Sequence, residues 1–527
     1  MHRIEHIFLF CLLLGIVWNT NAQNNRKIQY RADIGLYDEE FLPGAQRLIG
    51  HVAFAQDNIR GYCDSAYLYE RENYLIAFGD RVKIRVGDSV VLYGRKAYYD
   101  GNFKIASIAH NVRLEKKDSY LLSDSLIYDL NLDMGYYLTG GKIFNGEDTL
   151  TSQTGRYYTK TDNAYGNGNV QLKSKTYRMD CDSLRYNAQS KIAFFISPTH
   201  LLSSEDSSEI FTNRGWYDTE RENAQLTGDV QIFNKAQKLF ADSVHYYKDL
   251  QFGRAWNNVT VVDTEQNYIL KGNFVEHHEN GGLSVATDST LLILIDNNDS
   301  LYLHADTLKI LFDSTHSAQW MSAFNKVKFY RHDLQCACDS LMYLVEDSII
   351  TMYYNPVAWS EEYQLSADTI HFTILDSTNM RIDLCKAGFI VGGLFDNTEF
   401  NQIKGINITG FIHNKELYRV DIINNAECIY YLQEEDSSLI GINTSITNEM
   451  CIFLEENKIS QIRFYDQPDG KIYPDKQLEE KSRKLQDFRW LDEYRPYKIA
   501  DLFVKPIPRY KDEGGEASEK GTKKERR

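Results

Sequence analysis

A short phrase that recurs along the chain constrains the fold more than any other feature of this 527-residue sequence. It consists of a small residue, Asp, Ser or Thr, and then apolar or aromatic residues at alternate positions. Successive copies are about 60 residues apart at first and about 30 apart later, periods that are typical of repeat architectures. We therefore expect a repetitive, elongated array whose units bury their apolar faces by stacking. Six clear copies are centred on Asp124, Asp182, Asp242, Asp306, Asp339 and Asp368, and a looser one on Asp64.

Each copy of the phrase has the periodicity of a β-strand. Its apolar and aromatic residues are two positions apart, so that they fall on one face of a strand. The Asp-Ser or Asp-Thr before them predicts a turn, because short polar side chains can bond to nearby backbone amides. The pairs are Leu126 and Tyr128, Leu184 and Tyr186, Val244 and Tyr246, Leu308 and Ile310, Leu341 and Tyr343, and Ile370 and Phe372.

A second phrase, Gly, Asn or Asp followed by alternating apolar residues, accompanies most copies of the first. Examples begin at Gly168, Gly228, Asn257 and Asn325. This pattern predicts a tight turn that leads into a half-buried strand, and strands joined by tight turns are antiparallel. The composition agrees, because 36 Tyr and 26 Phe stand against only eight Pro, and aromatic residues favour strands whereas proline interrupts them. The sequence therefore predicts an all-β fold of stacked antiparallel strands.

The ends of the chain differ from its middle. Residues 1–22 resemble a cleaved secretory signal, because an apolar run from Ile7 to Val17 precedes Thr20-Asn21-Ala22. The run is shorter than the roughly 20 residues that span a membrane, which disfavours the alternative of an anchor. We expect β-rich regions at 23–270, 271–384 and 385–470, and a polar, partly disordered tail at 471–527. In this tail, Asp475 is expected to cap a short amphipathic helix that carries Leu478, Leu485, Phe488 and Leu491.

Charge and motifs exclude several classes of function. The formal net charge of −16, without a sustained basic stripe before the tail, argues against nucleic-acid binding. The sequence lacks a phosphate-binding Gly-rich loop, a His-Glu-x-x-His motif and a Gly-x-Ser-x-Gly motif. Glu276-His277-His278-Glu279 is better explained by a solvated loop than by a metal site.

The seven cysteines after residue 22 are an odd number, so at least one is free or pairs between chains. We expect no enzyme activity, cofactor or metal.

The ordered repetition of Ala241–Tyr246 and its sister phrases, paired with Gly228-Asp229-Val230 and Gly168-Asn169-Val170, resembles the OstA-like family that includes LptA. The resemblance covers roughly residues 25–375. It implies β-jelly rolls bent into a V-shaped, open-sided groove, which carry lipopolysaccharide by its acyl chains through the periplasm to the outer membrane without catalysis. The lipid-groove candidates that follow are Leu126, Tyr128, Leu184, Tyr186, Val244, Tyr246, Leu308, Ile310, Leu341, Tyr343, Ile370 and Phe372.

The partners implied by the resemblance are lipopolysaccharide or a similar acylated lipid, an outer-membrane transport assembly, and further copies that pair end to end. The exposed edges would lie near Val52–Phe54 and within residues 403–464, unless residues 471–527 fold back as a cap. The alternative function is a structural spacer or adhesion module without a ligand, whose interior is filled by its own side chains. A polysaccharide-degrading enzyme on a β-scaffold is the third and least favoured interpretation.

Overall fold

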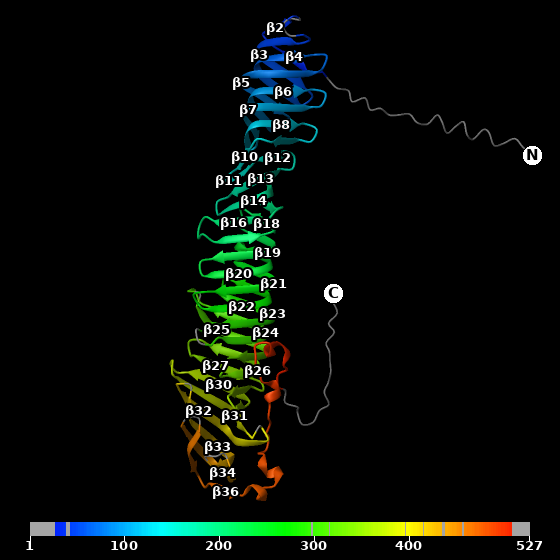
Figure 1. Ribbon diagram of the computed structural model, residues 1–527. Helices are drawn as coiled ribbons and strands as arrows, with labels where there is room; N and C mark the ends of the chain where they lie inside the picture. Colours follow the sequence, from blue (N-terminus) through cyan, green and yellow to red (C-terminus); the bar gives the residue numbers. More distant parts are fainter. Residues whose placement is uncertain are drawn as a thin grey trace, which may run out of the picture. The chain divides into compact units, whose positions relative to one another are not determined.

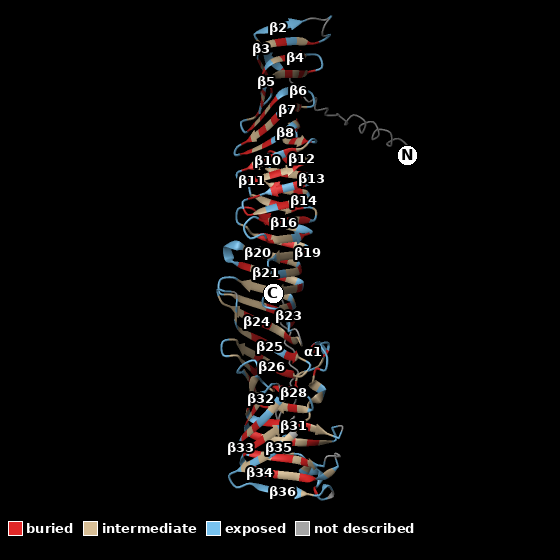
Figure 2. Ribbon diagram, turned by 60° about the vertical axis from the view of Figure 1, so that its left-hand side comes forward, coloured by how far each residue is buried: buried red, intermediate tan, exposed pale blue. Residues whose placement is uncertain are grey.

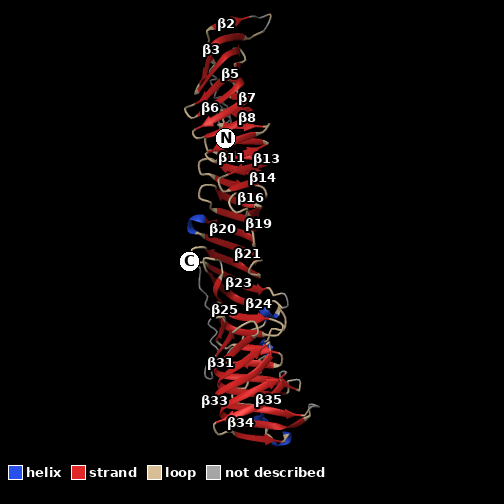
Figure 3. Ribbon diagram, turned by 90° about the vertical axis from the view of Figure 1, so that its left-hand side faces the viewer, coloured by secondary structure: helices blue, strands red, loops and turns tan. Residues whose placement is uncertain are grey.

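The computed structural model describes residues 27–508 apart from 38–39, 41–42, 297–298, 316, 396, 415, 435–437 and 456–457. The expected signal segment at 1–22 and the end of the expected tail, 509–527, lie outside the described residues. Among the described residues, strands dominate, and helix is limited to a few 3-10 turns and the single α-helical turn α1 (Asp501–Val504) (Figure 3). In the described part of the chain, no helix is long and apolar enough to cross a membrane. The predicted all-β class is confirmed.

The chain divides into two compact units, which meet in sequence at Ser204 and Glu205. Within each unit, consecutive strands stack on one another as antiparallel neighbours (Figure 1). The strands of the first unit are β1 (Gln29–Arg31), β2 (Ile34–Tyr37), β3 (Gln46–Gln56), β4 (Ile59–Tyr69), β5 (Tyr74–Val86), β6 (Val90–Asp100), β7 (Ile105–Lys116), β8 (Ser119–Asp129), β9 (Met134–Tyr137), β10 (Gly141–Asn145), β11 (Asp148–Ser152), β12 (Thr154–Tyr158), β13 (Asn163–Lys173), β14 (Tyr177–Asn187), β15 (Ile192–Phe195) and β16 (Thr199–Ser203).

The second unit continues the pattern with longer strands toward its end. Its strands are β17 (Glu209–Thr212), β18 (Arg214–Asp218), β19 (Ala224–Asn234), β20 (Gln237–Tyr247), β21 (Phe252–Asp263), β22 (Tyr268–His278), β23 (Leu283–Leu294), β24 (Leu301–Phe312), β25 (Ala318–Tyr330), β26 (Gln335–Leu344), β27 (Ile349–Tyr353), β28 (Val357–Ser360), β29 (Tyr363–Ser366), β30 (Thr369–Ile374), β31 (Asn379–Leu394), β32 (Glu399–His413), β33 (Glu416–Gln433), β34 (Leu439–Glu455), β35 (Lys458–Tyr465) and β36 (Asp469–Tyr473). Short 3-10 turns are η1 (Lys248–Leu250), η2 (Asp475–Gln477), η3 (Glu480–Arg483) and η4 (Asp492–Tyr494).

The two sequence phrases meet in the middle of neighbouring strands. In β7, His110 and Asn111 adopt left-handed φ values of 66° and 55°, and they form a bulge opposite Asp124 of β8, since Ala109 pairs with Ser125 and Val112 with Ser123. The prediction that both phrases are turns between strands is therefore wrong. A two-residue bulge needs the same left-handed backbone as a tight turn, so it selects the same Gly, Asn and Asp residues.

The bulges bend each long strand, so that it contributes to two layers. We name as layer A the halves that follow the motif aspartates, such as residues 125–129 of β8, and as layer B the halves that precede them, such as 119–123. The buried positions alternate along both halves, and the layers face each other across the interior. The layers join along the line of bulges. On the opposite side, called the mouth, both layers end in turns.

Residues 474–508, called the strap, run back along the second unit from β34 to β24 (Figure 1). The expected amphipathic helix does not form, and no side chain caps η2. Leu485, Phe488 and Leu491 instead lie in an extended segment with short 3-10 turns and pack on the sheet. Tertiary packing against a flat apolar face overrides the weak local helix signal.

The first strand edge also differs from expectation. Residues 53–55 of β3, which include Phe54, pair with β1, and residues 46–49 pair with β2. The outermost strands are therefore β1 and β2, whose residues are all exposed, including Ile34, Leu36 and Tyr37. These strands precede the first motif copy, so the repeat gave no sign of them.

Candidate binding cavity

An apolar cavity of about 530 Å³ lies between the layers of the second unit. Layer A contributes Phe372, Ile382 and Ile408, and layer B contributes Ile390 and Ile403. The strand periodicity of β30, β31 and β32 places these side chains inward. The volume lies within the range of roughly 300–1,000 Å³ that is usual for ligand sites, which are mostly apolar with a few polar groups. The cavity can therefore hold an apolar chain.

Polar groups border this cavity only where the layers end at the mouth. Arg331 Nε lies 2.5 Å from Asp333 Oδ1. Asp376 accepts hydrogen bonds from Asn379 and Thr378 in its own turn, and these bonds hold the pKa of its carboxyl group well below the usual range. These groups are partnered within their own layer, and the space between the layers is lined by apolar side chains such as Ile412.

The wall formed by layer B is one sheet thick and is covered on its outer side by the strap. In β31, Ile390 faces the cavity, whereas Phe389 and Val391 pack against strap residues that include Leu485 and Phe488. Figure 2 shows the resulting concentration of buried residues around β31, β33 and β34. Burial on both faces explains why residues 388–394 of β31, its half in layer B, include no polar side chain.

Three buried glutamines, one on each of β26, β29 and β32, bind the strap. Gln402 donates to Arg483 O (2.7 Å) and accepts from Leu485 N (2.8 Å). Gln364 repeats the arrangement six residues further along the strap, donating to Arg489 O (2.9 Å) and accepting from Leu491 N (2.7 Å). Gln335 accepts from Arg495 Nε (2.8 Å). A side-chain amide can thus mimic a strand's donor and acceptor pair toward an extended backbone.

The interior of the first unit is filled by its own side chains. The inward residues Leu126 and Leu184 are 1% and 0% exposed, and Tyr128 and Tyr186 are 0% and 1% exposed. The tyrosine hydroxyls are partnered, Tyr128 with Thr159 (2.8 Å) and Tyr186 with Asp148 (2.5 Å), and burial raises the pKa of Tyr128 to about 12. A side chain next to a space as large as a methylene group would keep some accessible surface, so this region is close-packed.

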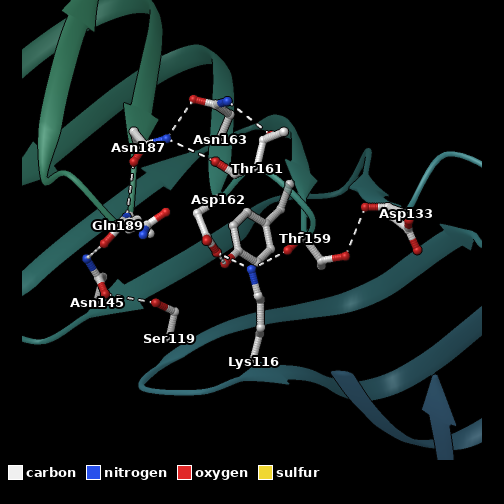
Figure 4. Close-up of polar contacts among 12 residues, drawn as sticks. Lys116, Ser119, Asp133, Asn145, Thr159, Thr161, Asp162, Asn163, Asn187 and Gln189 are labelled. Atoms are coloured by element: carbon white, nitrogen blue, oxygen red, sulfur yellow. Dashed lines mark hydrogen bonds and ion pairs between the residues drawn. The ribbon is translucent and has the colours of Figure 1, made fainter. Parts of the chain in front are cut away.

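Hydrogen bonds also join layer A to layer B across the mouth of the first unit. Lys116 Nζ, at the end of β7, donates to the carbonyl oxygen of Thr159 and lies 2.5 Å from Asp162 Oδ1, both in the turn after β12 (Figure 4). Further along the stack of strands, Asn145 Nδ2, at the end of β10, donates to Ala188 O, in the turn after β14 (2.7 Å). We call these contacts the mouth clasps.

A third mouth clasp lies near the start of the first unit. Gln56 Nε2 donates to Gly101 O (3.0 Å), and Tyr99 OH donates to Gln56 Oε1 (2.5 Å). Lys104 Nζ lies 2.7 Å from Asp57 Oδ2 in the same pair of turns. Mouth clasps therefore recur at several positions along the stack of strands in this unit.

The structure places the remaining sequence candidates on inward faces of layer A. Val244, Leu308, Ile310, Leu341 and Ile370 are buried. Tyr246 and Tyr343 are half-buried, and the hydroxyl of Tyr246 donates to Glu279. Among the twelve candidates, Phe372 lines the cavity described above.

The sequence motif missed most of the cavity, because the apolar side chains that line it come largely from residues 380–459, where the Asp phrase is absent. The signal that was present is the alternation in Ile403-Lys404-Gly405-Ile406-Asn407-Ile408. Strand periodicity alone identified that segment as half-buried. It did not indicate that the inward face borders empty space.

The cysteines and the Glu276–His278 segment have surroundings that are typical of structural residues. The seven cysteines after residue 22 are free, and burial raises the pKa of Cys63 to about 12. Glu276 bonds to Arg254 and His278, and His277 bonds to Ser284. Within the described residues, no group of three or more His, Cys, Asp and Glu side chains could hold a metal ion.

The fold and the cavity define a repeat protein of stacked antiparallel β-jelly rolls with an apolar interior site. Residues 26–182 match the family described as OstA-like protein. No curated protein sequence matches the chain. Among solved structures, it is similar to LptH from Pseudomonas aeruginosa, the LptA homologous periplasmic component of a lipopolysaccharide transport device. That similarity has 14% identity and a TM-score of 0.20, and covers 22% of this chain and 82% of LptH.

Proposed function

We propose that the protein is a non-catalytic, exported carrier that holds lipopolysaccharide, or a similar acylated lipid, by its acyl chains on the way to the outer membrane. The observation that carries this proposal is the apolar cavity of about 530 Å³ between the layers of the second unit. Burial of an acyl chain contributes about 0.8 kcal/mol per methylene group. Affinity can therefore arise without a cationic site for the headgroup, in keeping with the acidic composition.

The match of residues 26–182 to the OstA-like family supports the same function. The family resemblance implies lipid transport through the periplasm, with partners in an outer-membrane assembly and further copies joined end to end. The exposed strands β1 and β2 offer an edge for such pairing. The proposal includes export of the protein by a signal peptide, residues 1–22, that is cleaved after residue 22.

The second candidate function is a spacer or adhesion module without a ligand. The packed interior of the first unit favours it, because the inward side chains of Leu126, Tyr128, Leu184 and Tyr186 are only 0–1% exposed. The two functions differ in whether the cavity of the second unit takes up lipid.

Binding of purified lipopolysaccharide to the full chain tests the proposal. Ile403→Trp fills the cavity and should lower the bound lipid at least about tenfold, since it occupies the space of the acyl chain. The matched control, Ile446→Trp, enlarges an isoleucine that is 59% exposed and should bind like the wild type. Equal binding by both variants, or lack of binding by the wild type, would reject the carrier function.

A further inference from the structure

We infer that acyl chains occupy only the second unit and that the first unit is a sealed spacer, although the family match lies in the first unit. The inference rests on the proposed carrier function, and it assigns the acyl-binding site to one part of the chain. It follows from two independent observations: how much free space lies between the layers, and whether polar contacts join the layers across the mouth.

The first observation is the available space. In the first unit, every motif side chain that points inward is 0–1% exposed, as shown by Leu126, Tyr128, Leu184 and Tyr186. An acyl chain could enter there only if these side chains were displaced. Their displacement would break close-packed contacts, and the contacts made by the acyl chain would only compensate for that loss. In the second unit, Ile382 and Ile390 keep 8% and 9% of their surface beside an existing cavity. A ligand in that cavity gains contacts without displacing side chains.

The second observation is the mouth. A lipid whose headgroup stays in water must pass its chains between the free ends of layers A and B. In the first unit this path is crossed by buried polar contacts: Lys116 to Thr159 and Asp162, Asn145 to Ala188, and Gln56 to Gly101. Opening it would leave Lys116, which is 8% exposed, without its partners. Opening this path is therefore unfavourable, because buried donors and acceptors would lose their partners.

The second unit presents a different mouth beside its cavity. Arg331 bonds to Asp333 in its own turn, and Asp376 bonds to Thr378 and Asn379 in its own turn. These contacts stiffen each rim separately. The cavity opens between the rims, with Ile374 at its border 42% exposed. Acyl chains can therefore enter sideways at this level while the headgroup remains outside.

Photolabelling of the intact wild-type protein tests the inference without any substitution. The probe is palmitic acid that carries a diazirine on its acyl chain, with the labelled residues located by mass spectrometry. We expect adducts on cavity residues such as Ile382, Ile403 and Ile412, and at least tenfold lower yield on residues 105–187. Excess lipopolysaccharide should compete with the probe.

The outcomes separate this inference from the carrier function. Comparable yields on Leu126 or Tyr186 would overturn the sealed spacer but support lipid carriage. If neither unit were labelled, the carrier function itself would fail, and the inference with it. In Ile403→Trp, labelling of the second unit should fall at least tenfold, whereas Ile446→Trp should label like the wild type. Retained labelling in Ile403→Trp would contradict the assignment to this cavity.

Discussion

The two units share one strand pattern but use the space between their layers differently. In the first unit, tyrosines with bonded hydroxyls fill the interior, and the mouth clasps join the layers. In the second unit, branched aliphatic side chains such as Ile382, Ile390 and Ile403 surround a cavity, and a strap supports one wall from outside. The comparison teaches that the repeat determines the scaffold, whereas side-chain size and cross-mouth polarity determine whether the scaffold has room for a ligand.

Removal of the strap should have the largest effect, and only in the second unit. Ending the chain at Tyr473 exposes layer B side chains, among them Trp359, Val391 and Phe400. Each large apolar side chain loses about 1.5–3 kcal/mol of burial, so we expect the second unit to lose more than about 5 kcal/mol of unfolding free energy. Denaturant unfolding followed by hydrogen exchange would measure each unit separately.

A chain that ends at residue 508 is the matched control, because it keeps every described strap contact. It should unfold like the full-length protein. The shorter chain should also form concentration-dependent oligomers through the exposed apolar face. Unchanged stability of the second unit after strap removal would show that the strap does not support the cavity wall.

The sequence predicted the scaffold better than the site, for a physical reason. Alternating pairs such as Leu126 and Tyr128 report which face is inward, because burial acts on each strand locally. The bulge at His110-Asn111 resembles a turn, since both need left-handed backbone. The clasp between Lys116 and Asp162 and the bond between Gln364 and Leu491 join residues far apart in sequence. Such pairings leave no periodic signal.

Breaking a mouth clasp should destabilise the first unit. Asp162→Ala leaves the Lys116 ammonium group buried without its carboxylate, and we expect a loss of about 3–5 kcal/mol in that unit. Lys116→Met combined with Asp162→Ala removes both charges and should recover part of the loss. Chemical denaturation of the single and double variants measures this coupling.

Asp57→Ala provides the comparison for that clasp. It breaks the pair with Lys104, whose side chains are 28% and 34% exposed. Solvent screens this pair, so its loss should cost only about 0–1 kcal/mol. Equal effects of Asp57→Ala and Asp162→Ala would contradict a special role for the buried clasp.

A single strap glutamine should have a smaller effect, confined to the second unit. Gln364→Leu leaves Leu491 N–H and Arg489 C=O without their partner. The expected loss is about 1–3 kcal/mol, with faster proteolysis of the strap as a second readout. Gln461→Leu changes an exposed glutamine and should be neutral; a comparable loss there would mean that the effect is not specific to strap docking.

A pH dependence of stability is expected at the end of the strap. Lys328 Nζ donates to Leu502 O (2.9 Å), and burial lowers the pKa of Lys328 to about 8. Between about pH 8 and 10.5 the unfolded chain therefore binds more protons at this position than the folded chain, so its contribution to stability rises with pH. Lys328→Met should lack this rise. If the stability of the wild type and of the variant changed with pH in the same way, Lys328 would not be the source of the pH dependence.

The central claim is that ligand space exists in the second unit and not in the first. Hydrogen–deuterium exchange of the full-length protein, with and without purified lipopolysaccharide, tests it most directly. The account predicts slower exchange in residues 374–414, which border the cavity, and unchanged exchange in residues 105–163. Protection of residues 105–163 equal to that of 374–414 would contradict it.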